Sequence, residues 1–164
     1  MKKLKLFLSY YKAHWKLFVG DMICALIVAL VDTVFPMMSK YTLDSIIPTF
    51  ELSLLLKMIL IMTLMYIVRA VAFWFINYWG HVFGTKVEAD MRRDIFSHIE
   101  NQDFAFFDNH RTGKIMLRVT NDLFEVTELA HHGPENVFIC GVMVIGSFIY
   151  LFIVNRLLAL IILC

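Results

Sequence analysis

Residues 106–122 read FFDNHRTGKIMLRVTND and lie between two very apolar stretches of the chain. This segment is too polar to sit inside a bilayer, and its residues are too patterned for a random linker. The apolar stretches beside it are long enough to cross a hydrocarbon core about 30 Å thick, which takes about 20 helical residues. The chain is therefore predicted to alternate between membrane-spanning helices and a polar segment outside the membrane.

The composition also indicates an integral membrane protein. Of the 164 residues, 60% are hydrophobic and 18% are charged, with a mean hydropathy of +0.71. A soluble domain is usually about 45–50% apolar and about 25% charged. The net charge of +1 gives no sign of a nucleic-acid partner, and apolar runs of this length argue strongly against a soluble enzyme.

The predicted fold is an all-α membrane protein whose long transmembrane helices extend into the cytoplasm. The spans are expected at about residues 17–38, 52–80 and 134–154, with the start of a fourth at 157. Pro36 should help to end the first helix, and Gly133–Pro134 should break the chain before the third. The fourth run has only eight residues at about 1.5 Å each, too short to span, so the chain is expected to be part of a larger domain.

Basic residues predict the orientation. Residues 1–16 carry five lysines, and residues 81–133 carry six lysines or arginines, whereas the loop 39–52 has only Lys40. We therefore expect a multi-pass protein of the cell membrane in contact with lipid, with its N-terminus and residues 81–133 in the cytoplasm.

The cytoplasmic segment 81–133 is predicted to form a stalk of two helices. Val87, Met91 and Ile95 recur every four residues with no proline among them, which is an amphipathic helix pattern. Residues 80–102 alone would extend about 33 Å at helical rise, and a similar run over 113–128 would return. Connections between helices are usually about 2–8 residues, which disfavours the alternative of a solvated loop.

Aromatic residues mark the end of this stalk. Phe106 and Phe107 lie where the chain must turn in water, and exposed rings there favour a partner's pocket. The alternative is that both rings pack between the stalk's own helices. Asp108 is expected to cap a short helix, and Thr112–Gly113 to give a turn and a new helix start, since glycine tolerates positive φ.

Two motifs in this region resemble a known family. Residues 92–99, RRDIFSHI, match R-x-x-x-F-x-H-[LI], and residues 106–122 match F-F-D-x-x-x-T-G-x-[LI]-x-x-R-x-x-x-D. Together they resemble the first intracellular loop of ATP-binding cassette (ABC) exporters. Upstream, residues 36–48 are similar to the family's P-x-x-x-K-x-x-x-D-x-x-x-P at the exit of the first membrane helix. Leu117 departs from the family, which often has serine there.

The resemblance implies a truncated six-helix exporter transmembrane domain of the type 1 fold, covering residues 1–164. It implies that the region around residues 106–114 is a coupling helix that docks on a nucleotide-binding domain, either fused downstream or separate. It also implies ATP-driven export with a second transmembrane subunit, as a homo- or heterodimer, and ATP and Mg bound in the nucleotide-binding domain. The implied docking residues are Phe106, Phe107, Asp108, Thr112, Gly113, Lys114 and Arg118.

Nucleotide chemistry is not expected in this chain. No GxxxxGK[ST] motif occurs among its seven glycines, so the loop that cradles phosphates is absent from the sequence. We expect no catalytic residue and no cofactor site, and the chain alone is not expected to be an enzyme.

Charged residues in the spans suggest the translocation path. Asp21 and Asp32 are eleven residues apart and share one helix face within about 20°. A central Asp costs roughly 2.5–3.5 kcal/mol on insertion scales, so this face should meet the bundle or a wet cavity. Asp21 is expected to reach interfacial water. For Asp32, a cavity role and a structural hydrogen bond remain open.

The second span carries Arg69 near its middle, where it should face inward and pair with an acid or a carbonyl. Asp32 is the obvious partner. Met62 and Met65 lie on the same stripe, which fits helix packing or an adaptable substrate wall. Asp32, Arg69, Met62 and Met65 are the possible translocation-path residues.

Histidines and carboxylates cluster before the third span, at Glu128, His131, His132 and Glu135. These are zinc-ligand types, but the spacing matches no zinc signature. We expect a polar cap at the membrane face and no metal site.

A rival hypothesis is a multispanning membrane scaffold or sensor whose stalk docks a cytoplasmic signalling partner. A non-functional gene fragment is a further alternative. The transported substrate cannot be read from these residues.

Overall fold

The computed structural model describes residues 2–163, apart from the side chains of residues 2–4, 109, 130 and 163. Residues 1 and 164 of the predicted domain lie outside this range. Over the described range the elements are all helical and no strand occurs, which confirms the all-α class. In order they are α1 (Lys2–Ala13), α2 (Trp15–Tyr41), η1 (Thr42–Ile46), η2 (Ile47–Thr49), α3 (Leu52–Phe75), η3 (Ile76–Gly80), α4 (His81–Glu100), α5 (Phe104–Asn109), α6 (Thr112–Leu117), η4 (Arg118–Asp122), α7 (Leu123–Val154) and α8 (Arg156–Leu163).

Three continuous helical runs are long and apolar enough to cross a membrane. They are Trp15–Thr49, Leu52–Glu100 and Thr112–Val154. Each passes through a π-helical or 3₁₀ turn without leaving helical geometry: η1 and η2 in the first run, η3 in the second and η4 in the third. The apolar windows predicted from the sequence are thus parts of longer helices.

Neither predicted proline break occurs. Pro36 lies inside α2, and Pro134 lies inside α7, which runs through Gly133 as well. Proline removes one backbone donor from a helix, but in membrane helices neighbouring groups can satisfy the freed carbonyl, so the helix continues. The α-helical part of the first run therefore extends to Tyr41 and continues as η1 and η2, and the third span has no separate start at residue 134.

The chain forms two compact units. We call residues 1–21 and 77–135 the stalk unit, and residues 22–76 and 136–164 the membrane unit.

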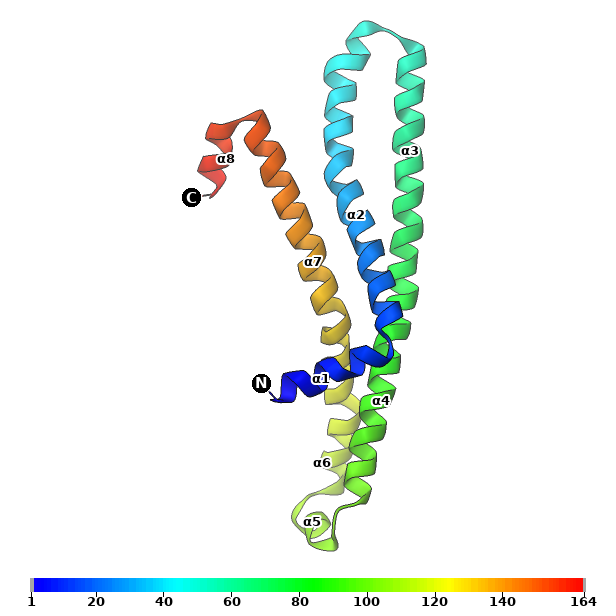
Figure 1. Cartoon of the computed structure of the whole chain (residues 1–164), viewed down its shortest axis with the longest axis vertical. Helices are drawn as coiled ribbons and strands as arrows, with labels where there is room; N and C mark the ends of the chain where they lie inside the picture. The colour runs from blue at the N-terminus through cyan, green and yellow to red at the C-terminus, as the bar shows by residue number, and fades with distance from the viewer. Residues whose placement is uncertain (1, 164) are drawn as a thin grey trace. The chain divides into compact units, whose positions relative to one another are not determined.

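In the stalk unit, α4 runs antiparallel to α6, η4 and the first turns of α7, with α5 at the end of the pair (Figure 1). Phe83 and Val87 on α4 are each only 1% exposed. Helix α1 packs on α4, where the Tyr10 hydroxyl donates a hydrogen bond of 2.8 Å to Asp94 Oδ2. The Tyr11 ring also lies edge-on to Phe83 at 5.2 Å between centroids. The N-terminal segment is therefore part of this bundle.

The returning helix of the stalk unit has a regular buried face. Its buried residues recur at every fourth position, namely Val119, Leu123, Thr127, His131 and Glu135. The face is apolar near the tip and becomes polar toward the other end.

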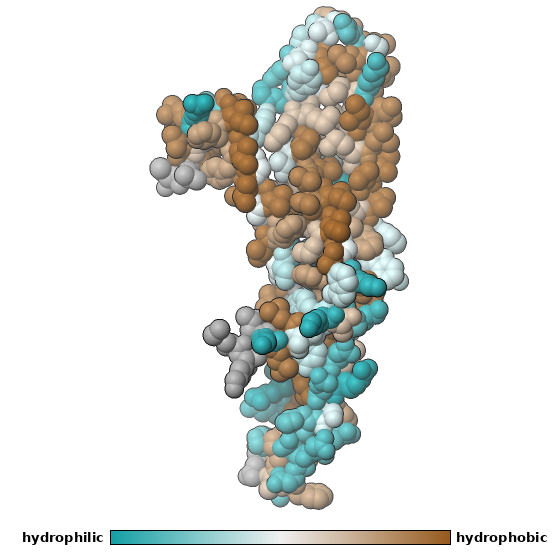
Figure 2. Space-filling model, in the orientation of Figure 1, coloured by the Kyte–Doolittle hydropathy of each residue, from teal (hydrophilic) through white to brown (hydrophobic). Residues whose placement is uncertain are grey.

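In the membrane unit, α2 and α3 form a hairpin (Figure 1). Its buried core is made of Ala25, Val28, Ala72 and Ile76. Small residues such as these alanines let helix backbones approach closely. The outer surface is mostly apolar, as the brown side chains over the hairpin in Figure 2 show, while teal side chains cover the far end of the stalk unit.

The hairpin closes through η1, η2 and Phe50. Phe50 has a left-handed backbone conformation with φ of 54°, and its ring is 93% exposed. At the same end, Lys40 Nζ lies 2.5 Å from Asp44 Oδ2, one turn further along the chain.

Two glycines of α7 give a matched test of packing in the membrane unit. A Cβ built on Gly146 would lie 2.9 Å from Thr33 Cγ2, whereas one on Gly141 would meet nothing within 4 Å. Thr33 cannot easily turn away, because its hydroxyl donates a 2.8 Å hydrogen bond to the Ala29 carbonyl. We expect Gly146→Ala to lower the free energy of unfolding by about 1–3 kcal/mol.

Gly141→Ala should leave the free energy of unfolding unchanged or raise it by up to about 1 kcal/mol, because alanine favours the helix more than glycine does. Denaturation of the chain in detergent micelles, followed by circular dichroism, measures both. Equal effects of the two substitutions would contradict this packing.

Candidate functional site

The tip of the stalk, residues 103–118, is built on the short helix α5. Asp103 is its N-cap, and its side chain accepts a 2.9 Å hydrogen bond from the Phe106 backbone N–H. Such a cap satisfies one of the donors that a helix leaves free at its start. After α5 the chain turns at residues 110–111 and enters α6.

The aromatic residues of the tip pack on each other. The Phe106 and Phe107 rings meet edge to face at 5.4 Å, and Phe106 stacks on His110 at 4.4 Å with 21° between the ring planes. Both phenylalanines are half-buried. The most exposed aromatic ring of the tip is instead Phe104, at 90% exposure, a residue that the family motif does not include. One hint of its importance was present in the sequence, namely that Phe104 lies two residues before the motif.

Two local expectations at the tip are wrong. Asp108 lies inside α5 and is not its cap, because the helix begins four residues earlier at Phe104. Gly113 lies in the first turn of α6 and has no positive φ. The expected helix start at Thr112 is correct, but it needs no left-handed residue because Arg111 enters the helix with extended backbone angles.

The remaining predicted docking residues lie together on the surface of the tip. Thr112, Gly113 and Lys114 on α6 and Arg118 at the start of η4 are all exposed. With His110 and Arg111, the two basic residues line one hollow of the tip. The tip thus carries both an exposed aromatic ring and a group of positive charges.

The charged pair expected in the membrane unit is present. Arg69 on α3 meets Asp32 on α2 through two parallel contacts, Nε to Oδ1 at 2.5 Å and Nη2 to Oδ2 at 2.9 Å. The guanidinium also lies 5.8 Å from the ring centres of both Tyr66 and Phe73. Bidentate pairing is the strongest form of arginine–carboxylate contact. It joins the two helices of the hairpin through a pair of opposite charges.

The methionines assigned to the translocation path lie near this pair. Met62 and Met65 are half-buried, as is Arg69 on the same helix. Met62 lines an apolar hollow with Phe35 and Tyr66. Met65 is not among the residues that line it. The structure therefore places one of the two methionines beside an open apolar surface.

The position of Asp21 differs from the one expected from the sequence. It was predicted to reach interfacial water, but it is 1% exposed. It lies in the stalk unit beside His131, whose Nδ1 is 3.9 Å from Asp21 Oδ2. The expected polar cap, Glu128 to Glu135, thus gains a buried carboxylate from α2. It also gains His81 from α4, which sequence spacing could not have revealed.

A family model for the ABC transporter transmembrane region matches residues 18–164. The chain belongs to this family. The resemblance drawn from the loop motifs is therefore confirmed, and the three long apolar helices fit a location in the membrane.

Several curated relatives are similar to this ABC transporter membrane domain. It is 35% identical over 157 residues to the uncharacterized ABC transporter ATP-binding protein YwjA of Bacillus subtilis, a match that covers 96% of this chain and 27% of YwjA. It is 30% identical over 155 residues to the ATP-dependent lipid A-core flippase of Chromohalobacter salexigens, covering 94% of this chain and 26% of the flippase. The chain spans about a quarter of the length of these relatives.

The Asp32–Arg69 pair predicts strongly coupled substitutions. Arg69→Leu should preserve membrane insertion but leave the Asp32 carboxylate without its partner, and Asp32→Asn should strand the guanidinium. The double variant should be more stable than the sum of the single effects indicates, by about 0.5–3 kcal/mol. Unfolding in micelles measures this coupling, and strictly additive effects would exclude it. In a complete transporter, Arg69→Leu is expected to alter transport.

Substituting the two aspartates of the tip, Asp103 and Asp108, should have different effects on the stability of α5. Asp103→Ala should cost α5 about 0.5–2 kcal/mol by removing its cap. Amide hydrogen exchange at Phe106 should then become faster. Asp108→Ala, the matched control, should leave that exchange rate unchanged. Faster exchange in the Asp108 variant alone would show that the cap is misassigned.

Proposed function

We propose that this chain forms part of the translocation pathway of an ATP-driven ABC exporter and carries its first coupling loop. In this proposal the stalk tip docks on a nucleotide-binding domain that binds ATP and Mg and hydrolyses the nucleotide. That domain is either joined to the chain in a longer polypeptide or a separate subunit. The observation that carries the docking proposal is the exposed Phe104 ring on α5.

The tip has the make-up of a binding surface. Burying a phenylalanine side chain contributes roughly 1.5–3 kcal/mol. Phe104 is 90% exposed in the folded chain, so nearly all of its apolar surface is available for burial against a partner. In the same helix, Phe106 and Phe107 are half-buried and pack on each other edge to face. A central aromatic anchor with charged residues around it is the usual arrangement of a binding hot spot. Arg111 and Lys114, which line the hollow of the tip, favour a partner surface that carries acidic groups.

The position of α5 allows a movement of this helix to be transmitted to the stalk helices. Short segments join it to both stalk helices, residues 101–103 on the α4 side and residues 110–111 on the α6 side. A movement imposed on α5 therefore acts on the ends of two long helices at once. A loop without its own helix and cap would absorb such a movement.

In the membrane unit, the Asp32–Arg69 pair and Met62 are proposed to contribute to one wall of the pathway. A second transmembrane subunit, identical or related, would supply the opposite wall. The N-terminus and the stalk tip would lie on the cytoplasmic side, where the basic residues are concentrated. Two relatives carry the name ATP-dependent lipid A-core flippase, and an amphipathic lipid is the substrate class we infer from that similarity.

Site-specific photo-crosslinking tests the docking proposal. A benzophenone-bearing phenylalanine analogue is placed at Phe104 in the transporter, in its native membranes, and crosslinked products are identified by mass spectrometry. The expected product joins the tip to a nucleotide-binding domain. The matched control is the same analogue at Phe124, which is 53% exposed but lies on α7 away from the tip, and it should not give that product. Crosslinking of Phe104 only to another cytoplasmic protein would favour the scaffold or sensor instead.

A further inference from the structure

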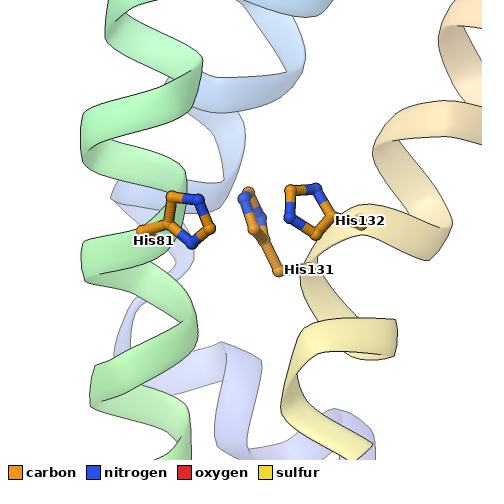
Figure 3. Close-up of side chains that lie close together, drawn as sticks. All are labelled: His81, His131 and His132. Atoms are coloured by element: carbon orange, nitrogen blue, oxygen red, sulfur yellow. The ribbon is translucent and has the colours of Figure 1, made fainter. Parts of the chain in front are cut away.

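Six ionisable side chains meet in the stalk unit, where α4 and α7 lie beside the first turns of α2. They are Asp21, His81, Glu128, His131, His132 and Glu135. Figure 3 shows the three imidazole rings close together, with His81 coming from α4 and both His131 and His132 from α7, and their ring centres lie 4.5–5.7 Å apart. None of these residues belongs to the docking tip or to the Asp32–Arg69 pair.

The centre of the cluster is buried but not satisfied. His131 is 2% exposed and Asp21 is 1% exposed. Both ring nitrogens of His131 and both carboxylate oxygens of Asp21 are buried without a hydrogen-bond partner. Leaving a polar group in this state costs about 1–3 kcal/mol. A group that accepts lone pairs from this site would remove part of that cost.

The backbone makes room for the central ring. A Cβ built on Gly80 would lie 2.2 Å from His131 Cε1 and 2.4 Å from His131 Nε2, whereas one on Gly84 would be 3.7 Å from the nearest His131 atom. Only glycine at residue 80 therefore lets α4 approach the imidazole. The ring position is built into the packing of two helices.

The donor atoms lie close together. His81, His131 and His132 can each offer a ring nitrogen within 4.8 Å of the others. Glu128 reaches two of them, with Oε1 at 3.8 Å from His81 Nδ1 and Oε2 at 3.5 Å from His132 Nε2. We propose that His81, His131 and His132 bind a divalent transition-metal ion of the zinc class, with Glu128 as the fourth ligand.

The chemistry of this donor set fits such an ion. Zinc binds imidazole nitrogens at about 2.0–2.1 Å, so tetrahedral ligand atoms lie about 3.4 Å apart. The ring nitrogens, now within 4.8 Å of one another, need to close by up to about 1.4 Å. The side chains of His81 and His132 can move because they are 52% and 41% exposed. Imidazole with one carboxylate also discriminates against Mg²⁺ and Ca²⁺, which prefer oxygen ligands.

Two further carboxylates are placed to orient the rings. Glu135 Oε2 lies 3.4 Å from His132 Nδ1, on the opposite side of that ring from Glu128. Asp21 Oδ2 lies 3.9 Å from His131 Nδ1. Metal-binding histidines commonly donate the N–H of their second ring nitrogen to a carboxylate. Glu135 is already within hydrogen-bond distance of His132, whereas Asp21 would have to move closer to His131. The polar cap expected from the sequence thus becomes, in this proposal, half of a site completed by α4.

Binding would tie two helices together. His81 is the first residue of α4, and the other ligands lie on α7. One ion would therefore clamp the outgoing and returning helices of the stalk at the end opposite to the tip. It would also offset the negative charge of Glu128 and Glu135, which lie beside the rings.

Metal titration of the full chain in detergent tests the proposal. After treatment with a chelator, Zn²⁺ binding is measured by calorimetry, and Co²⁺ serves as an optical probe whose visible absorption reports tetrahedral nitrogen and oxygen ligands. We expect one ion per chain. His81→Ala and His132→Ala should each weaken binding by at least about 10–100-fold. His98→Ala is the matched control, because this histidine is exposed on α4 outside the cluster, and it should bind as the unaltered chain does.

A second measurement needs no substitution. Zn²⁺ should protect His81 and His132, but not His98, from modification by diethyl pyrocarbonate in the unaltered chain. Absence of saturable Zn²⁺ binding would overturn the proposal. So would unchanged binding in both the His81 and the His132 variants, which would move the ion to the other possible set of Asp21, His131 and Glu135.

Discussion

Hydrocarbon offers no hydrogen-bond partner to a peptide group, and this constraint decides most of the structure. Every backbone segment that enters the bilayer must bond within itself, as a helix does, and residues 2–163 accordingly contain helices and no strand. Polar side chains in the spans face the same constraint, so Asp32 and Arg69 meet each other across α2 and α3. The alanines of the hairpin core keep these helices close enough for that contact.

Sequence reasoning succeeded where the bilayer leaves one physical solution. The apolar runs had to be helices, and a charge in the middle of a span had to find an opposite charge, which identified the Asp32–Arg69 pair. It failed at Pro36 and Pro134, both of which lie inside helices. The rule that proline ends a helix comes from chains in water, and it loses force where other groups satisfy the freed carbonyl.

The local details of the sites were harder to predict. The position of the tip followed from its aromatic motif, but the cap depends on where α5 begins, so Asp103 was missed in favour of Asp108. The exposure of Phe104 depends on which rings stack, and the sequence does not encode that directly. His81 is distant in sequence from His131, and only the antiparallel packing of α4 on α7 brings their rings to 5.7 Å.

The buried face of the returning stalk helix, with a member at every fourth residue from Val119 to Glu135, has a geometric consequence. From Leu123 onward the helix is α-helical, and there four residues turn it by about 400°, so the face advances about 40° at each step and winds around α7 in a right-handed sense. One straight neighbour can follow such a spiral for only part of its length. Helix α4 therefore cannot shield both ends alone, and the first turns of α2, with Asp21, act as the third wall. The amino-terminal residues up to Asp21 are therefore part of the packed core of the stalk unit.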